Sequence, residues 1–144
     1  MMNFPTGRMD LYLTDIGEPR DNQLRLVLAE AVLGEITSID DADFRIENVR
    51  PMIVTDSSRV FELEWADYVA YAVRNESFWK SESNEPPFEN HLVRRFDSAF
   101  LKYVSDTTFA DDDYPGPLRH WALSTLNHCV DVVSACAPSV RLIE

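Results

Sequence analysis

Two histidines and an aspartate near the C-terminal end, His120, His128 and Asp131, are the residues whose types best suit metal chemistry. Imidazole and carboxylate groups are common ligands of zinc and related ions. Their spacing argues against a shared site, because on a β-strand the side chains of His128 and Asp131 point to opposite faces. Asn127 suits a turn, which places His128 beside the turn and His120 several residues away. We interpret both histidines as strand residues with ordinary hydrogen bonds, and we expect no metal and no cofactor.

A second polar group is the run Arg74, Asn75, Glu76 and Ser77, where an apolar segment ends. Asn75 and Glu76 could orient a substrate or a partner. In the competing interpretation, Asn75 bonds the backbone of its own turn and Arg74 pairs with a nearby carboxylate. The general tendency of such residues to satisfy local backbone groups favours this second interpretation.

Two polar segments, residues 80–90 and 107–117, are longer than the usual connection of about four to six residues. Aromatic rings border both, and the second also carries three consecutive aspartates. These residues are Phe78, Trp79, Phe109, Asp111, Asp112, Asp113 and Tyr114. Rings supply contact area and carboxylates steer a basic partner, so the pattern suits a protein interface. The alternative is that each ring pins its loop to the core.

Several kinds of functional site have no counterpart in the sequence. It contains no glycine-rich phosphate loop and no Gly-x-Ser-x-Gly motif. Ala122 stands where a calcium loop beginning at Asp111 requires a glutamate. Cys129 and Cys136 would lie more than roughly 20 Å apart on an extended strand, beyond disulfide reach, so we expect buried, reduced thiols and no zinc site.

Composition and charge limit the possible partners. The 144 residues are 45% hydrophobic, enough for one core, and we expect a single domain over residues 1–144. A net charge of −12 repels phosphate backbones and anionic lipids. The longest apolar run, residues 68–73, is far shorter than the roughly 20 residues of a membrane span, and the N-terminus lacks a leader pattern. We expect a cytoplasmic monomer or homodimer that binds neither nucleic acid nor membranes.

Alternating apolar and polar residues predict β-strands. Between residues 59 and 77 every second residue is apolar, with a break at Ala66 and Asp67 that fits a bulge or a tight turn. Residues 24–33 are apolar on both faces, which narrowly favours a central strand over a helix.

Turn chemistry predicts two hairpins. Residues 44–54 alternate, and the TDSS sequence at 55–58 would join them to the following strand as an antiparallel pair. Residues 120–135 form a second extended stretch, in which Asn127 marks the turn.

One segment has the helical period instead. Apolar side chains recur there at spacings of four, seven and eight, in Phe96, Phe100, Tyr103 and Val104. Asp97 or Ser98 can cap the first turn of this helix. The sequence therefore predicts a mostly β fold, an antiparallel sandwich of about seven or eight strands with one short helix. An α+β layout, with one curved sheet and a packed helix, is the alternative.

Three segments resemble a family of small bacterial proteins with no established activity. They are FELEWADYVAYAVRNES, SAFLKYV and HWALSTLNHCVDVVSACAP, about half of the chain. The shared features are an aromatic-x-Val-x-Asn-Glu-Ser element and a late strand pair that contains histidine. This resemblance draws attention to residues 74–77 and implies no catalytic residue.

Two functional hypotheses follow. The first is a protein-binding module that captures a basic partner through its acidic, aromatic loops, as an immunity protein captures a basic nuclease toxin. The second is a small-ligand binder or enzyme with a pocket near Asn75, Glu76, His120 and His128, in which Glu76 acts as a base and a histidine shuttles protons. We rank the binding module first, because no recognisable catalytic spacing is present.

Overall fold

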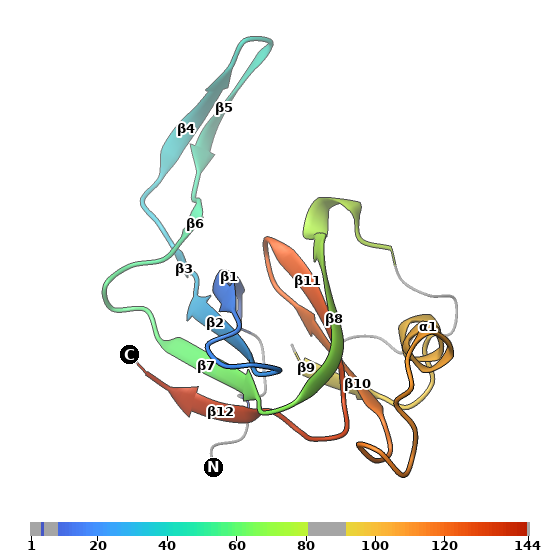
Figure 1. The fold of residues 1–144 in the computed structure, drawn as a ribbon. Coiled ribbons are helices and arrows are strands. Elements are labelled where there is room, and N and C mark those ends of the chain that lie inside the picture. The colour runs from blue at the N-terminus through green and yellow to red at the C-terminus, as the bar shows by residue number, and fades with distance from the viewer. Residues whose placement is uncertain (1–3, 5–8, 81–91, 144) are drawn as a thin grey trace.

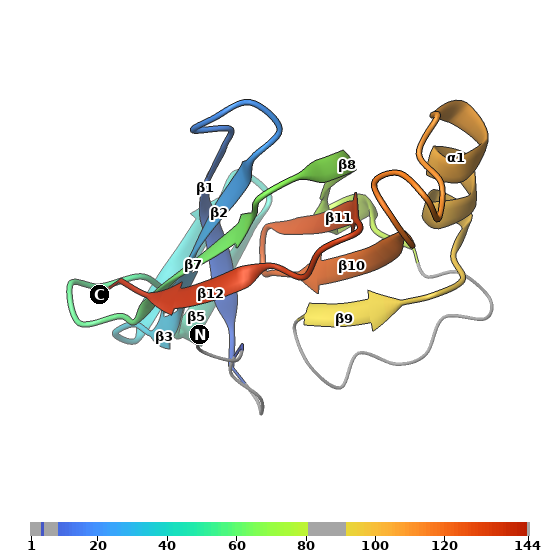
Figure 2. The same ribbon diagram turned by 60° about the horizontal axis from the view of Figure 1, so that its bottom comes forward.

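The computed structural model describes residue 4, residues 9–80 and residues 92–143. Antiparallel strands make up 53% of the structure, with a single short α-helix. Two four-stranded sheets pack against each other, and a two-stranded arm projects from one of them (Figures 1 and 2). The mostly β fold with one short helix, predicted from the sequence, is therefore confirmed.

The two sheets are each defined by their strand order. Sheet 1 has the order β1 (Leu11–Gly17), β2 (Leu24–Glu30), β7 (Val60–Trp65) and β12 (Ser139–Leu142). Sheet 2 has the order β8 (Tyr68–Asn75), β11 (His128–Ser134), β10 (Arg119–Ser124) and β9 (Leu92–Arg95). Inward-facing side chains from both sheets form one core, in which the rings of Trp65 and Trp121 meet edge to face with centroids 6.3 Å apart.

The central strand predicted within residues 24–33 is confirmed as β2. It lies between β1 and β7, and side chains on both of its faces are buried. Leu26 and Leu28 face the shared core, while Val27 and Ala29 on the opposite face are also buried. Burial on both faces explains why this strand is apolar throughout instead of alternating.

The long alternating run between residues 59 and 77 proves to be two strands in different sheets. The strand β7 ends at Trp65 in sheet 1, and β8 begins at Tyr68 in sheet 2. The break at Ala66 and Asp67 is therefore the point where the chain crosses between sheets. Ser134, which is fully buried, donates its hydroxyl to the Asp67 carbonyl at 2.6 Å and fixes this crossing.

One predicted hairpin is confirmed and the other is wrong. The strands β10 and β11 pair as predicted around Asn127. Residues 44–54, in contrast, do not pair with β7, whose neighbours are β2 and β12. The inward side chains Phe61 and Leu63 are fully buried, and this burial places β7 beside β2 in the core instead.

The segment between β2 and β7 forms the arm, residues 32–53. Its four strands are β3 (Val32–Leu33), β4 (Thr37–Asp41), β5 (Phe44–Val49) and β6 (Met52–Ile53). β3 pairs with β6 at the base and β4 pairs with β5 at the tip, and Figure 1 shows the tip extending away from both sheets. The base is fixed by the Gly34 amide, which donates to Pro51, and by the Tyr12 hydroxyl, which donates to Met52.

The predicted helix is α1 (Ala99–Thr107), and Ser98 caps it by accepting a hydrogen bond from the Leu101 amide. It lies on the face of sheet 2 that is turned away from sheet 1 (Figure 2), against β10 and β11. Val104 is its buried residue, whereas Phe96 precedes the helix and is exposed. In the described residues, no helix has the length and apolar character that a membrane crossing requires.

The turn between β10 and β11 binds the edge of sheet 1. The Leu13 amide donates to Asn127 Oδ1 at 2.9 Å, and Asn127 Nδ2 donates to the Leu13 carbonyl at 3.0 Å. The Leu126 amide donates to the Leu11 carbonyl. Because β1 is an edge strand, these bonds replace the strand neighbour that it lacks and join the two sheets.

We predict that Asn127→Ala destabilises the protein by about 2 kcal/mol, because the backbone groups of buried Leu13 lose their partners. Urea unfolding followed by tryptophan fluorescence measures the effect. Ser105→Ala, an exposed polar-to-alanine change, should alter the unfolding free energy by less than about 0.5 kcal/mol. Equal effects of the two substitutions would show that Asn127 does not join the sheets.

Candidate functional site

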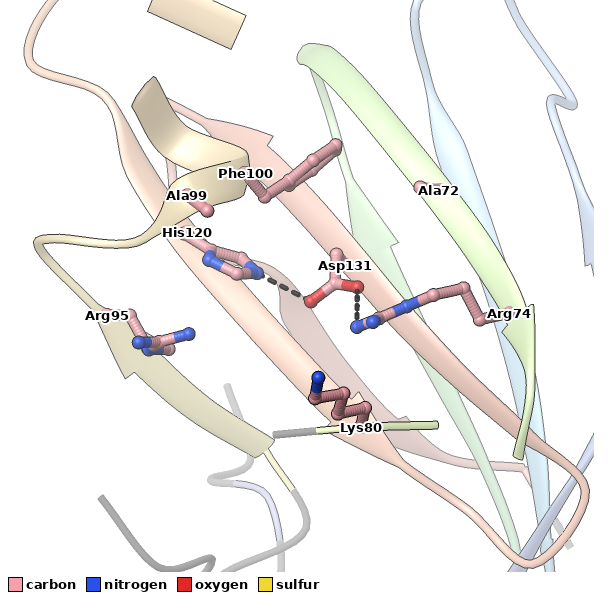
Figure 3. A pocket seen from close by; sticks show the side chains of 8 residues that line it. All are labelled: Ala72, Arg74, Lys80, Arg95, Ala99, Phe100, His120 and Asp131. Atoms are coloured by element: carbon pink, nitrogen blue, oxygen red, sulfur yellow. Dashed lines mark hydrogen bonds and ion pairs between the residues drawn. The ribbon is translucent and has the colours of Figure 1, made fainter. Parts of the chain in front are cut away.

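The candidate site is a diagonal row of charged and polar side chains on the outer face of sheet 2. The register pairs Asp131 with Ala72 of β8 and with Ala122 of β10. Arg74 lies two residues after Ala72, and His120 lies two residues before Ala122, so both share a face with Asp131. His120 in turn pairs with Arg95. The row therefore takes one residue from each strand in sheet order, namely Arg74, Asp131, His120 and Arg95 (Figure 3).

Asp131 is the buried centre of this row. Its two oxygens are both engaged: Arg74 Nη2 lies 2.9 Å from Oδ2, and His120 Nε2 lies 2.7 Å from Oδ1. Burial alone would raise the pKa of this carboxyl, but the hydrogen bonds from His120 and Arg74, together with the charge of Arg74, outweigh burial and hold the pKa below its usual range. Asp131 is therefore an ionised carboxylate at neutral pH.

His120 is almost fully buried and engages both ring nitrogens. Nε2 contacts Asp131, and Nδ1 lies 2.7 Å from Ser98 Oγ. Ser98 Oγ already accepts from the Leu101 amide, so its hydroxyl proton is available for Nδ1. These contacts are all satisfied by an imidazole with its proton on Nε2. Its Nε2–H group then donates to Asp131, and its Nδ1 accepts from the Ser98 hydroxyl.

The row forms the floor of a pocket of about 290 Å³ under α1. The residues that line it are Ala72, Arg74, Lys80, Arg95, Ala99, Phe100, His120 and Asp131. Lys80 reaches the pocket from the segment after the short 3₁₀ helix η1 (Glu76–Phe78), and Figure 3 shows its amine directed toward the His120–Asp131 pair. Phe100 of α1 lies edge-on to His120, with ring centroids 5.5 Å apart.

The described lining of the pocket is basic, in contrast to the chain as a whole. Among the described residues, three basic side chains and one carboxylate line it, whereas the chain carries −12. The carboxylate and Arg74 neutralise each other, while Lys80 forms no ion pair within the described residues. The described side chains therefore give this hollow a basic lining in an acidic protein, which suits small anions.

Serine, histidine and aspartate are the residue types of nucleophilic triads, but the contacts here differ. In such triads, the serine bonds Nε2 and the aspartate bonds Nδ1. Here Ser98 bonds Nδ1 and Asp131 bonds Nε2, and the Ser98 oxygen is committed to the helix cap and does not line the pocket. The chain of bonds orders the pocket and presents no nucleophile to it.

The structure places the residues predicted near the end of β8 in different environments. Arg74 pairs with Asp131 and lines the pocket. Asn75 Oδ1 accepts from the Ser77 amide, which is the local backbone role that we considered, and the side chain of Glu76 is exposed in η1. Of the four residues of the expected pocket, Asn75, Glu76, His120 and His128, the observed pocket contains His120 alone.

His128 lies beside the turn, as the sequence indicates, and across from Asn75. In β11 it stands three residues before Asp131, so the two side chains occupy opposite faces of sheet 2. Its Nδ1 is buried and has no hydrogen-bond partner within the described residues. No group of three or more histidine, cysteine, aspartate or glutamate side chains in the described part of the chain could hold a metal ion. Both cysteines are free, Cys129 buried and Cys136 half-buried.

The predicted loop residues are mostly exposed. Phe78, Phe109 and Tyr114 are exposed large rings, and Trp79 is half-buried. Asp112 and Asp113 are also exposed. A second hollow of about 280 Å³ lies among these loop residues and the start of β8, lined in part by Tyr68, Phe109 and Tyr114.

Asp111 has a structural role in this loop. Its Oδ1 accepts from the amides of Asp113 and Tyr114, both at 2.9 Å. A side chain that closes a turn in this way is not free to meet a partner. All three aspartates of the run are exposed, and Asp111 is the one whose carboxylate closes the turn.

Three larger side chains of the pocket lining, Lys80, Arg95 and Phe100, were not among the predicted site residues, and neither was Ser98, which contacts His120 from outside the lining. Ser98 and Phe100 were assigned to the helix alone, as a possible cap and as part of its apolar stripe. The strand β9, with Arg95 at its end, has only four residues and gave no alternation to recognise. The sequence did hold one usable signal. In the predicted β10–β11 hairpin, Asp131 pairs with Ala122, and His120 lies two residues before Ala122 on the same strand, so His120 and Asp131 lie on the same face of the sheet.

Comparisons of the chain with protein-family models, curated proteins and solved structures found no match. The class of protein is therefore defined by the fold and the site alone. It is an antiparallel β-sandwich with a roofed, basic pocket on the outer face of one sheet and a projecting two-stranded arm.

We predict that Asp131→Asn destabilises the protein by about 2 kcal/mol at pH 7, because Arg74 and His120 lose a charged partner. The folded pKa is lowered, so the stabilisation is complete above the ordinary aspartate pKa and is lost as the pH falls below about 4. Urea unfolding at pH 7 and pH 3 should therefore show a smaller difference between the two proteins at pH 3.

Asp106→Asn is the matched control, since this exposed aspartate pairs with Lys102 on the surface of α1. It should change the unfolding free energy by less than about 0.5 kcal/mol at either pH. A difference between wild type and Asp131→Asn that is the same at both pH values would exclude an ionised Asp131 as its cause.

Proposed function

We propose that the protein binds a small anionic ligand in the pocket on sheet 2. The observation that carries this proposal is the gathering of Arg74, Lys80 and Arg95 around one hollow in a chain of net charge −12. A ligand anion in this hollow would lie near the N–H groups of several basic side chains and could accept charge-assisted hydrogen bonds from them.

The bonding of His120 favours binding over catalysis. A general acid or base must exchange a proton with the ligand, and for this it needs a ring nitrogen that faces the pocket. Both nitrogens of His120 are engaged, with Asp131 and Ser98. Its role in this proposal is to hold Asp131, which in turn directs the Arg74 guanidinium along the pocket floor.

We predict that inorganic phosphate binds in this pocket and that Lys80→Gln weakens it about fivefold, as expected for the loss of roughly 1 kcal/mol from one exposed cation. Amide chemical-shift titrations with phosphate at constant ionic strength measure the affinity and locate the site. The shifted resonances should belong to residues around Arg74, His120 and Asp131.

Lys102→Gln provides the matched control, because Lys80 and Lys102 are the two lysines of the chain. Lys102 is exposed on α1, pairs with Asp106 and lies outside the pocket lining. Its substitution changes the net charge equally and should leave the phosphate affinity unchanged. Equal weakening by the two variants would mean that general electrostatics, and not the pocket, attracts the anion.

A second function, capture of a basic protein, is favoured by the arm. In β4 and β5, Ile39 pairs with Ile46, and these residues lie on the same face as Phe44. The opposite face carries Arg45, which lies within ion-pair distance of two carboxylates. The arm is therefore a ribbon with one apolar face that is about half exposed, and a two-stranded ribbon alone is marginally stable in water.

The charge of the arm indicates the kind of partner. Residues 32–53 contain five acidic and two basic side chains, so the apolar face is bordered by negative charge. The loop outside the arm has the same combination of apolar and acidic groups, because the rings of Phe109 and Tyr114 and the neighbouring aspartates are exposed. We propose a basic protein partner and a cytoplasmic location, and one form of this function is a bacterial immunity protein that captures a basic nuclease toxin.

We predict that the double variant Ile39→Ser, Ile46→Ser loses at least about fivefold in retention of a basic partner, because two apolar contacts are removed from the interface. Immobilised protein is exposed to an extract of the cells that produce it, and the retained proteins are eluted with salt and quantified. The variant Arg45→Gln, Glu47→Gln is the control, since it alters the charged face without changing the net charge. If no basic protein is retained, or if both variants retain it equally, the arm does not perform this function.

A further inference from the structure

We propose that the hollow between the start of β8 and the loop of residues 108–115 binds a methylated ammonium group. We call this site the aromatic hollow. No described residue lines both it and the pocket under α1, so the two sites are separate. Three features carry the inference: the rings that line the hollow, its acidic side chain, and its small number of hydrogen-bond acceptors.

Three aromatic rings line the aromatic hollow, which has a volume of about 280 Å³. Tyr68 belongs to β8, whereas Phe109 and Tyr114 belong to the loop after α1. Phe109 is fully exposed and Tyr114 is 81% exposed, so neither ring fills the core or pins the loop to it. Aromatic faces attract cations within about 6 Å of the ring centroid, which gives these exposed rings a use other than packing.

A carboxylate holds the Tyr68 ring in place. The Tyr68 hydroxyl donates to one oxygen of Glu18, and the Tyr71 hydroxyl donates to the other oxygen at 3.1 Å. The hydrogen bond to Glu18 raises the pKa of Tyr68 to about 12, so the hydroxyl keeps its proton at neutral pH. Glu18 therefore fixes the ring and places negative charge beside it, and both effects favour a cation next to Tyr68.

Asp67 gives the aromatic hollow its acidic character. It is the charged residue of the described lining, which includes no basic side chain. Its backbone carbonyl accepts from Ser134, while its carboxylate forms no ion pair within the described part of the chain. Asp112 and Asp113 are exposed in the same loop as two of the rings. The aromatic hollow therefore suits a cation, in contrast to the pocket under α1.

The number of acceptors in the described lining distinguishes between kinds of cation. The Tyr68 hydroxyl is engaged with Glu18, and the Thr108 hydroxyl is engaged with backbone groups at the end of α1 and in the loop. Among the lining side chains, this leaves Asp67 and Asn22 as acceptors. A guanidinium has five N–H donors and a primary ammonium has three. A quaternary ammonium has none and contacts the rings through its methyl groups, so it fits this lining best.

The experiment compares choline with 3,3-dimethylbutan-1-ol, which has the same shape but carries carbon in place of the charged nitrogen. Amide chemical-shift titrations at constant ionic strength measure both affinities. Choline should shift the resonances of residues 67–69 and 108–114 and should bind at least about fivefold more tightly than the alcohol, because the rings and Asp67 attract its charge. Methylguanidinium should bind more weakly than choline.

A methylated ammonium group can belong to a small molecule or to a methylated lysine of a protein. A short peptide that contains trimethyllysine is therefore titrated in parallel with choline. Tighter binding of choline would identify a small molecule as the ligand, and tighter binding of the peptide would identify a modified protein. Either result supports the site, provided that the shifted resonances are those of the aromatic hollow.

The variant Phe109→Leu tests the rings, because it keeps an apolar side chain and removes an aromatic face. It should weaken choline binding about threefold. Phe109 is fully exposed, so the substitution should not affect folding, which circular dichroism checks. Phe78→Leu is the matched control, since Phe78 is also an exposed ring and lies outside the described lining of the hollow. It should leave the affinity unchanged.

The variant Asp67→Asn tests the carboxylate and should weaken choline binding about threefold while leaving the alcohol unaffected. Asp43→Asn removes the same charge from an exposed residue of the arm and should have no effect. Equal weakening by the two variants would show that the net charge of the protein, and not the hollow, attracts the cation.

The remaining outcomes overturn the inference in distinct ways. Equal affinities for choline and the alcohol would exclude a cation site. Methylguanidinium that binds more tightly than choline would exclude the methylated ammonium. Choline binding that Phe109→Leu does not weaken would exclude the role of the rings. None of these results bears on the binding of phosphate in the pocket under α1, so this inference and the proposed function can fail separately.

Discussion

A carboxylate buried on a sheet face requires positive or hydrogen-bonding partners on every side, and Asp131 imposes this requirement on sheet 2. Its neighbours come from β8 and β10, and the second neighbour, His120, reaches α1 through Ser98. The same bonds therefore hold two strands and the helix cap in fixed relation. The pocket exists because the helix is held above the sheet by its first turn, with Phe100 beside the imidazole.

Sheet 1 carries a comparable ion cluster on its outer face, and the comparison shows what α1 adds. Glu62 is buried, and Arg25 Nε and Arg141 Nη2 contact its two oxygens at 2.6 and 2.7 Å. Burial alone would raise the pKa of Glu62, but the bonds and charges of the two arginines outweigh burial and lower it. Arg141 is about two-thirds exposed, and no described helix packs on this face, so the cluster joins β2, β7 and β12 at an open surface. On sheet 2, the helix lies over the corresponding ion pair of Arg74 and Asp131, and Lys80 is directed into the space between helix and sheet.

The sequence predicted the elements whose neighbours are close along the chain. Alternation identified β7 and β8, a run that is apolar on both faces identified β2, the helical period identified α1, and Asn127 marked the β10–β11 turn. The sequence could not predict which sheet each strand joins, because strand pairing depends on burial in three dimensions. Residues 59–77, for example, have the pattern of one strand but form two strands in different sheets. The placement of Arg74 beside a carboxylate was anticipated, whereas Lys80 and Arg95 reach the same pocket from segments that have no periodic signal of their own.

The position of the arm in the chain allows the arm to change without changing the pocket. β2 and β7 are direct neighbours in sheet 1, so residues 32–53 are an elaborated hairpin loop between two strands that already pair. The pocket draws all its residues from β8 onward, and the arm shares none of them. The arm can lengthen, shorten or exchange its apolar face without altering the register of sheet 2. A change of length or sequence in the arm would therefore leave the described lining of the pocket intact.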